Sequence, residues 1–460
     1  MQHEVRRSDL QNGENKVVTA SPNERIMTLL LHLSDIHFRK GEIATAMDPN
    51  AHLRQELLLD AVGQCQRLGA APDAVLVSGD VAFAGAPEEY EYALSWLDKL
   101  CRDCGTTLSA VFVIPGNHDV IRSIASRPLV QVLHRDIKNA SEGALDGLLR
   151  GLLSDEEASR LLYEALGSYN NFASQFFCDL LPPNRTFARR DIHLNDRSIL
   201  RMSGINSAFV SSAADVEKSL FIDPSSFQLI REHGVEHLVM CHHPYAWLKQ
   251  GEAFEDFLGS AARIHLFGHV HTNRILAGRD WVRIAASAAH PDRTEPGWEP
   301  GYNLIEVKVE GTGASRFLEI DAHVRVWQQR PGIFRVKVDR TGDDVFKQRF
   351  KLDPWTPPPS EILPKMDGET DTVIAEQQGI VHKPATRSDP MDPLRDIKVR
   401  FFKLTLSQKS AIAGKLNLLE EEDSNQPDFE RFRRAFLRAR DRGQVIDLQQ
   451  EVEEAIGKGR

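Results

Sequence analysis

The sequence lacks the marks of three classes of protein. No apolar run approaches the roughly 18 residues of a membrane-spanning helix, and the first, Thr28 to Leu33, is much shorter, so we expect no membrane contact. Five cysteines in 460 residues are too few, and odd in number, for a disulfide scaffold, which favours a reduced, cytoplasmic protein. Positive charge is not in excess either, because 56 Lys and Arg face 66 Asp and Glu. A net charge of −10 excludes a general nucleic-acid coat, so any contact with nucleic acid has to be local.

The chain divides into four predicted parts. Residues 1–25 are polar and carry no apolar core of a signal peptide, so we expect a disordered N-terminal tail. Between about residues 26 and 350, short apolar runs alternate with helical stretches, which is typical of an α/β domain, and residues 124–180 predict a helical insertion. The proline-rich residues 354–395 predict a linker that holds the next part away from the main domain. Residues 396–460 predict a small all-α interaction domain.

Five apolar runs predict strands of the α/β domain, and polar side chains follow each of them. The runs are residues 28–33, 73–77, 110–114, 237–240 and 264–267. The side chains that follow them, in order, are Asp35 and His37; Asp80; Asn117, His118 and Asp119; His242 and His243; and His269 and His271. Ligands of open α/β sheets bind beyond the carboxyl ends of strands, so we expect these clusters to meet. The spacing of two in Asp35-x-His37 and His269-x-His271 predicts extended segments with both side chains on one side.

In this order, the motifs resemble those of the calcineurin-like metallophosphoesterases: D-x-H, GD, GNH[DE], a later His, and GHxH. The resemblance covers about residues 26–310 and implies an αββα sandwich of two mixed sheets, with a dinuclear metal centre at their carboxyl edge. It assigns to one metal Asp35, His37, Asp80 and His271, and to the other Asp80, Asn117, His242 and His269, with Asp80 bridging. Mn, Fe, Zn and Ni all accept nitrogen and oxygen ligands, and we favour two Mn ions.

The resemblance also implies a reaction, the hydrolysis of a phosphodiester or phosphomonoester by a metal-bridging hydroxide. His118 is expected outside the metal ligands, as the general acid that protonates the leaving oxygen. Asp119 either orients His118 or holds its loop. Arg122 and His243 are expected to contact the substrate. The alternative for Arg122 is a surface ion pair, and the alternative for His243 is a supporting role beside the metal ligands.

Two other functions stay open. The first is a metal-dependent nuclease acting on DNA or RNA, which would need a short basic groove such as one near Arg185, Arg189 and Arg190. The second is a protein-interaction scaffold with a vestigial metal site. The scaffold is disfavoured because none of the expected metal ligands is missing.

The C-terminal helices resemble an effector-associated domain, a small helical adaptor of bacterial signalling and defence systems. The residues that carry this resemblance are Arg438 to Gly443, followed by Leu448 and Val452. Thr405 and Gln408 predict a capping box at the start of one helix. The resemblance implies that the enzyme is an effector, with a protein partner or self-association through these helices.

Overall fold

The structure, a computed structural model, describes residues 27–292, 297–357 and 392–458. The predicted tail, residues 1–25, and most of the predicted linker, residues 354–395, lie outside the described residues. Within the described ranges, no helix is both long and apolar enough to span a membrane. All five cysteines are free and buried, and the cytoplasmic location stays a prediction.

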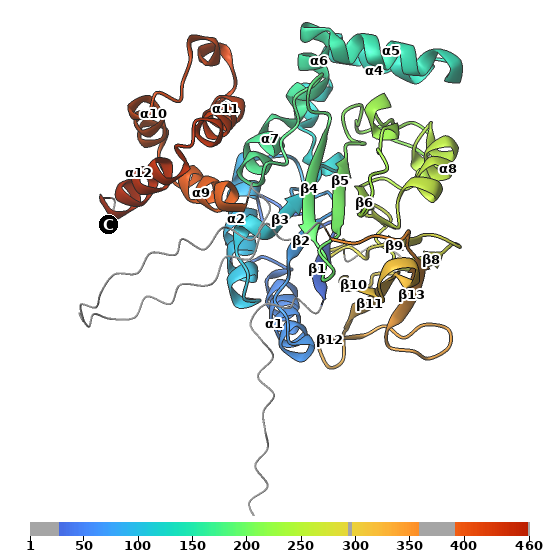
Figure 1. The fold of residues 1–460 in the computed structure, drawn as a ribbon. Helices are drawn as coiled ribbons and strands as arrows, with labels where there is room; N and C mark the ends of the chain where they lie inside the picture. The colour runs from blue at the N-terminus through green and yellow to red at the C-terminus, as the bar shows by residue number, and fades with distance from the viewer. Residues whose placement is uncertain (1–26, 293–296, 358–391, 459–460) are drawn as a thin grey trace, which may run out of the picture.

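Two mixed β-sheets form the centre of the main domain (Figure 1). One sheet has the order β12-β11-β10-β1-β2-β3, with β13 also paired to β11, and the other has the order β4-β5-β6-β7-β9-β8. The strands of the first sheet are β1 (Thr28–Leu33), β2 (Ala74–Val77), β3 (Val111–Val113), β10 (Gly301–Glu310), β11 (Phe317–Gln328), β12 (Ile333–Val336) and β13 (Phe346–Lys351). Those of the second are β4 (Phe187–His193), β5 (Ile199–Ile205), β6 (Val235–Cys241), β7 (Ile264–Phe267), β8 (Arg274–Ala277) and β9 (Val282–Ala285). Strands β1 to β3 are parallel to one another, as are β5, β6, β7 and β9, so the strand ends within each of these sets share one edge.

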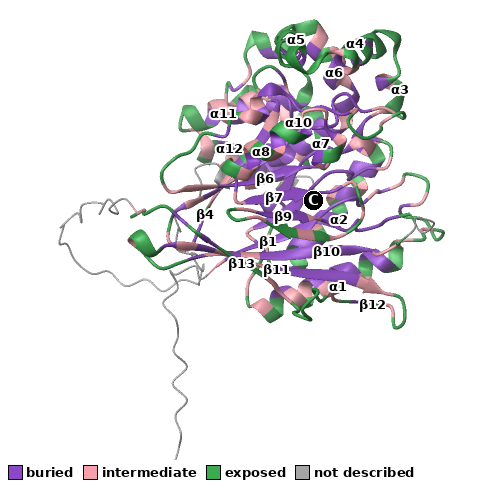
Figure 2. Cartoon of the chain, turned by 90° about the vertical axis from the view of Figure 1, so that its right-hand side faces the viewer, coloured by how far each residue is buried: buried purple, intermediate pink, exposed green. Residues whose placement is uncertain are grey.

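The alternation of side chains along β6 shows how the layers stack. Leu238 and Met240 belong to the core shared with β1 to β3, whereas Val239 and Cys241 pack against α8 (Gly251–Ala261). Helices α1 (Ala51–Leu68) and α2 (Pro87–Asp103) pack into the core on the side of the first sheet. Figure 2 shows buried strands inside and partly exposed helices outside. This is the expected αββα sandwich, so the predicted fold class is confirmed.

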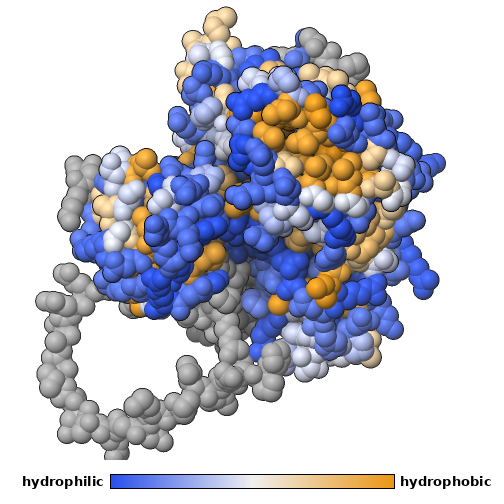
Figure 3. Space-filling view, turned by 90° about the horizontal axis from the view of Figure 1, so that it is seen from above, coloured by the Kyte–Doolittle hydropathy of each residue, from blue (hydrophilic) through white to orange (hydrophobic). Residues whose placement is uncertain are grey.

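A helical insertion joins β3 to β4, as predicted. Its helices are α3 (Arg122–Ala125), α4 (Pro128–Asn139), α5 (Glu142–Ser154), α6 (Glu156–Tyr163) and α7 (Gly167–Ala173). Seen from above, apolar residues gather on this part of the surface (Figure 3), where Leu129 and Val132 of α4 are exposed. The insertion thus presents apolar side chains outward as well as toward the core.

The C-terminal part contains four helices, namely α9 (Asp392–Phe402), α10 (Leu406–Lys415), α11 (Asp428–Asp441) and α12 (Val445–Lys458). The predicted capping box is present, because the backbone N–H of Gln408 donates to Thr405 Oγ1 at 3.3 Å and that of Thr405 donates to Gln408 Oε1 at 2.9 Å. Phe432, Phe436 and Leu448 pack in a second apolar core around which the helices assemble.

These helices lie against the main domain, so our expectation of a module held away from it is wrong. Asp179 of the main domain is fully buried, and its carboxylate accepts hydrogen bonds from Arg433 at 2.8 Å and from Arg185 at 2.6 Å. Arg185 also donates to Glu430 of α11 at 2.7 Å. The buried Nζ of Lys398 lies 3.8 Å from the centre of the Phe177 ring. Burial alone would raise the pKa of Asp179, but the two arginines lower it to about 2, so the carboxylate is charged. Complementary charges therefore join the two parts.

Asp179→Asn should loosen the C-terminal helices. The variant leaves Arg185 and Arg433 beside each other without their shared negative charge, and breaking a buried pair costs about 3–5 kcal/mol. We expect faster hydrogen–deuterium exchange in α9 and α11 and a lower thermal midpoint. Asp396→Asn is the control, because its exposed pair with Arg400 contributes less than about 1 kcal/mol. Unchanged exchange in Asp179→Asn would contradict the importance of this contact.

Candidate metal centre

The carboxyl ends of five strands bring the expected ligands together. The strands are β1, β2 and β3 of one sheet and β6 and β7 of the other. The expected ligands that follow them are Asp35, His37, Asp80, Asn117, His242, His269 and His271. Within this set, donor atoms of Asp35, His37 and His271 lie within 4.8 Å of one another, and so do those of Asp35, Asp80 and His242. The structure therefore unites residues that are more than 200 positions apart in the chain.

One half of the site surrounds Asp35. Its Oδ1 lies 3.3 Å from Nε2 of His271 and 3.8 Å from Nε2 of His37. Asp80 completes this half, because its Oδ2 lies 3.8 Å from the same nitrogen of His37. These are three of the contacts expected for a site made of two carboxylates and two imidazoles.

The other half surrounds Asn117. Its Oδ1 lies 3.2 Å from Nε2 of His242 and 3.0 Å from Nδ1 of His269. Asp80 is shared with this half too, since its Oδ2 lies 3.2 Å from Nε2 of His242. One carboxylate oxygen thus lies beside ligand candidates of both halves, as a bridging ligand must.

The ligand loops are not the extended segments that the spacing predicts. Asp35 and His37 have φ values of 50° and 51°, and His269 and His271 have 69° and 53°, all in the left-handed region. Asp80, at 52°, shares this conformation. After β1 the chain turns onto the end of β2, where the N–H groups of residues 36 and 37 both donate to the carbonyl of Asp80. Strain of this kind costs about 1–3 kcal/mol per residue and concentrates at functional sites.

Gly116 allows the loop after β3 to approach Asp80. A Cβ on Gly116 would stand 2.1 Å from Asp80 Oδ1 and 2.6 Å from its backbone nitrogen. No side chain fits there, so the position needs glycine. The approach lets the backbone N–H of His118 donate to Asp80 Oδ1 at 2.8 Å.

His118 lies at the edge of the cluster, and one of its ring nitrogens is within 4.8 Å of donor atoms of His37 and Asp80. Its Nδ1 is 2.8 Å from the carbonyl of Phe83, which can only accept, so Nδ1 carries the hydrogen and Nε2 is left for other partners. Burial lowers the pKa of this imidazole, against the opposing effect of Asp80.

Asp119 holds the loop and does not orient His118. Its carboxylate accepts from the backbone N–H groups of Gly116 at 2.9 Å and Ala82 at 3.0 Å, and from the hydroxyl of Tyr90 at 2.8 Å. Burial raises the pKa of Asp119 to about 6, with a further contribution from Asp80. Of the two roles that the sequence left open, the contacts match the second.

Two residues predicted to contact the substrate, His243 and Arg122, lie outside the cavity of about 380 Å³ that His37, His118 and His271 line. His243 is fully buried, with Nδ1 2.7 Å from the hydroxyl of Ser207 and Nε2 3.2 Å from Asn117 Oδ1. It also forms a possible donor group with His242 and His269, so its place is beside the ligands and not on the cavity wall. Arg122 is exposed at the start of α3 and is likewise outside the cavity lining.

The charges of the site call for a cation. Burial alone would raise the pKa of Asp35, but His271 and its neighbours hold it well below the usual range. Asp80 behaves in the same way through His242, whose own pKa rises to about 9 against the effect of burial. Two buried carboxylates that stay ionised need positive charge nearby. The buried atoms Asp35 Oδ1 and both ring nitrogens of His37 have no hydrogen-bond partner in the part of the chain that the structure describes, as expected for atoms that bind metals. The donor set and the contacts therefore fit divalent metals.

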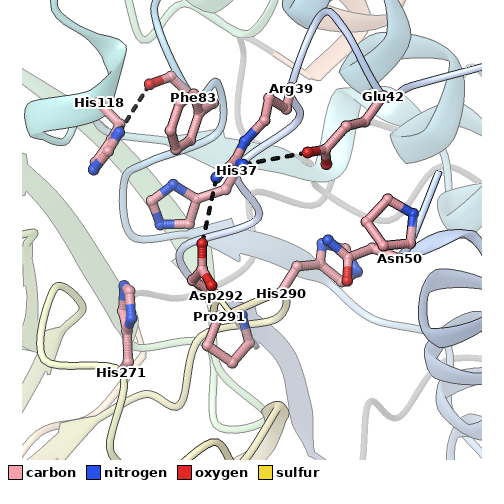
Figure 4. Close-up of a pocket in the computed structure, with 11 residues that line it drawn as sticks. His37, Arg39, Glu42, Asn50, Phe83, His118, His271, His290, Pro291 and Asp292 are labelled. Atoms are coloured by element: carbon pink, nitrogen blue, oxygen red, sulfur yellow. Dashed lines mark hydrogen bonds and ion pairs between the residues drawn. The ribbon is translucent and has the colours of Figure 1, made fainter. Parts of the chain in front are cut away.

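A cavity of about 380 Å³ opens beside the cluster (Figure 4). His37, His118 and His271 line one side of it. Arg39 and His290 also line it, and our reading of the sequence assigned neither a role. The signal for Arg39 was its position two residues after His37, whereas nothing near His290 in the sequence marks a site.

Comparisons with known proteins agree with the geometry. The family profile described as calcineurin-like phosphoesterase matches residues 28–273, and the one described as GTPase-associated adaptor domain matches residues 393–454. The second match confirms the predicted resemblance of the C-terminal helices to a small adaptor domain.

The chain is similar to the glycerophosphodiester phosphodiesterase GpdQ of Enterobacter lignolyticus (strain SCF1), with 36% identity over 131 residues, 28% of this chain and 43% of that protein. It is also similar to the uncharacterized metallophosphoesterase-like protein YydB of Bacillus subtilis (strain 168), with 24% identity over 256 residues, 52% of this chain and 48% of that protein. The chain thus spans less than half the length of either relative. Among solved structures, vacuolar protein sorting 29 from Cryptosporidium parvum aligns with a TM-score of 0.31 and 12% identity, over 71% of this chain and all of that one.

Asp80→Asn should weaken both metals together. The amide removes the negative charge that both halves of the site share, so affinity should fall by more than the roughly 10- to 100-fold that loss of a supporting residue costs. Elemental analysis after loading with Mn²⁺ and gel filtration measures this, with the exposed Asp136→Asn as the control. A wild-type protein that retains less than one metal per chain would contradict the assignment.

Proposed function

Because the chain belongs to the calcineurin-like phosphoesterase family, we propose that it holds two divalent metal ions and hydrolyses a small phosphodiester. One observation carries the proposal: Asp80 lies between two groups of nitrogen and oxygen donors, beside a cavity that His118 lines. The shared carboxylate supports a site for two metals, and the cavity supports a small substrate.

When bound, two such ions would supply positive charge and lower the pKa of a water molecule, which then attacks phosphorus. The protein sets the net charge of the site, because Asp35 and Asp80 contribute two negative charges against four positive ones. The remaining positive charge attracts an anionic phosphate. His37, His242, His269 and His271 add donors without adding charge when they are neutral.

His118 is proposed to protonate the leaving oxygen. The carbonyl of Phe83 fixes Nδ1 as the donor on one side of the ring, so a proton on Nε2 is the one available to a substrate in the cavity. Asp119 acts indirectly by tying the loop of His118 to the segment after Asp80, through Gly116 and Ala82.

Two of the three arginines of the expected basic groove are engaged within the protein, which disfavours the nuclease alternative. Arg185 pairs with Asp179 and Glu430, and the buried guanidinium of Arg190 donates to the carbonyls of Val111 and Phe176. These two arginines therefore serve the fold and are not available to a phosphate backbone. A phosphodiester is further supported by the printed name of GpdQ. Six of the seven expected ligands belong to groups whose donor atoms lie close enough together to hold a metal ion, which supports an enzyme over a vestigial scaffold.

The C-terminal helices are proposed to recruit a protein partner, which would make the enzyme an effector. The support is the match of residues 393–454 to an adaptor domain. The residues that line the cavity all lie between His37 and Asp292, so these helices leave the site open to substrate while they bind elsewhere.

Hydrolysis by the purified, Mn²⁺-loaded protein tests the proposal. We expect activity on bis-p-nitrophenyl phosphate to exceed that on p-nitrophenyl phosphate and on single- and double-stranded DNA. Fast DNA hydrolysis that falls steeply with added salt would establish the nuclease instead, because such a dependence reports phosphate-backbone binding.

His118→Asn should separate catalysis from metal binding. Without a general acid, turnover of a diester with an alkyl leaving group should fall by about 100- to 10,000-fold, while metal content stays at the wild-type level. The exposed His233→Asn is the matched control. Full activity of His118→Asn on the alkyl diester would remove the acid role and leave the metal site standing.

A further inference from the structure

One wall of the cavity lies beyond the metal cluster and consists of residues that are not expected metal ligands. The wall is built from the loop between β1 and α1, from Phe83, and from the segment that follows β9. Its residues are Arg39, Glu42, Pro49, Asn50, Phe83, His290, Pro291 and Asp292. Figure 4 shows these side chains around the same opening as His37, His118 and His271. A group bound there would lie next to the proposed general acid.

Arg39 is held in place before any substrate arrives. Its guanidinium lies 3.7 Å from the centre of the Phe83 ring, Nη1 donates to Glu42 at 3.2 Å, and Nη2 is 3.8 Å from a carboxylate oxygen of Asp292. The side chain is 36% exposed, so some of its N–H groups remain accessible. A guanidinium fixed by an aromatic face and two carboxylates loses little freedom when it binds a ligand.

The charges of this wall select against a second phosphate. Glu42 and Asp292 contribute two negative charges against the one of Arg39, so the wall is negative overall. A cationic head group is disfavoured as well, because both carboxylates already pair with Arg39 and the positive guanidinium covers the face of Phe83. What remains is a neutral group that both donates and accepts hydrogen bonds.

His290 adds a buried acceptor. Its Nδ1 is 2.8 Å from the carbonyl of Ile36, so Nδ1 carries the hydrogen and Nε2 is the acceptor. The residue is 3% exposed, and Nε2 has no hydrogen-bond partner among the described residues. A buried acceptor without a partner is costly, and a hydroxyl group from a ligand would satisfy it.

We propose that this wall is the subsite for the leaving alcohol, and that it takes a neutral polyhydroxyl group such as glycerol or a pentose. The inference rests on the proposed phosphodiesterase function and names its substrate class. Arg39 donates to the hydroxyl oxygens, while the carboxylates of Glu42 and Asp292 and Nε2 of His290 accept from the hydroxyl hydrogens. The ester oxygen of that alcohol then faces His118, which supplies its proton as the bond to phosphorus breaks.

Arg39→Met tests the subsite, with the exposed Arg279→Met as the control. The substrates are the diester of glycerol and ethanol, the diester of choline and ethanol, and bis-p-nitrophenyl phosphate, which has no hydroxyl groups. For the glycerol diester, kcat/KM should fall about 10- to 100-fold, the range expected when hydrogen bonds to a charged group are lost. For bis-p-nitrophenyl phosphate, which offers no hydroxyl groups to Arg39, kcat/KM should fall less than for the glycerol diester, and metal content should stay at the wild-type level.

Three outcomes would overturn the subsite. They are an equal loss on bis-p-nitrophenyl phosphate, which would make Arg39 a general phosphate ligand; no loss on the glycerol diester; and a larger loss on the choline diester. A binding measurement keeps the test independent of turnover. Saturation-transfer NMR should show contact with the glycerol protons in His118→Asn, and loss of that contact when Arg39→Met is added. If no diester is hydrolysed but this contact is seen, the proposed function fails together with the leaving-alcohol role, while the binding of a polyhydroxyl group beside Arg39 stands. If the glycerol protons show no contact, the subsite itself fails.

Discussion

Asp35 and Asp80 are 0% and 1% exposed, and they lie at the ends of two neighbouring parallel strands, β1 and β2. Two carboxylates buried this close repel each other and lose their hydration, so each raises the other's pKa unless positive charge is brought in. The surrounding histidines supply only part of that positive charge, because burial lowers the pKa of His269 to about 4 and so keeps its imidazole neutral. Metal ions meet both requirements at once: they neutralise the carboxylates and use the lone pairs of neutral imidazoles.

This constraint explains why the strained backbone conformations lie at the expected metal ligands. Five expected ligands adopt left-handed backbone conformations, and Gly116 lets two loops meet at a distance that no side chain permits. The loops hold these conformations because rigid parts surround them. Asp119 ties the loop of β3 to that of β2 through backbone N–H groups, and the five ligand-bearing strands are hydrogen-bonded within two buried sheets. The free energy gained by burying the apolar cores of the sandwich thus offsets the cost of these strained conformations.

The sequence predicted what depends on local pattern. Apolar runs followed at once by polar residues predicted the strands β1, β2, β3, β6 and β7 and the side chains that gather at their ends, because each strand and the residues after it are neighbours in the chain. Strands such as β8 were missed since they are short, partly exposed and carry polar residues such as Arg274. The wall around Arg39 and His290 was missed for another reason. These residues are about 250 positions apart, and the pairing of β1 with β10, together with hydrogen bonds from His290 to the carbonyls of Asp35 and Ile36, brings their loops together.

The position of the adaptor helices follows from the same distinction between local and distant contacts. Proline-rich composition predicted separation, but it says nothing about Asp179 and Arg433, which meet across 254 positions. The contact joins the C-terminal helices to the end of the helical insertion, and Arg190 links that end to the first residue of β3, through the carbonyls of Phe176 and Val111. Strand β3 leads directly into the loop of Asn117 and His118. The C-terminal helices therefore stay outside the cavity and yet contact the end of the insertion, which Arg190 ties to the strand that precedes Asn117 and His118, so the two parts are linked through a shared scaffold.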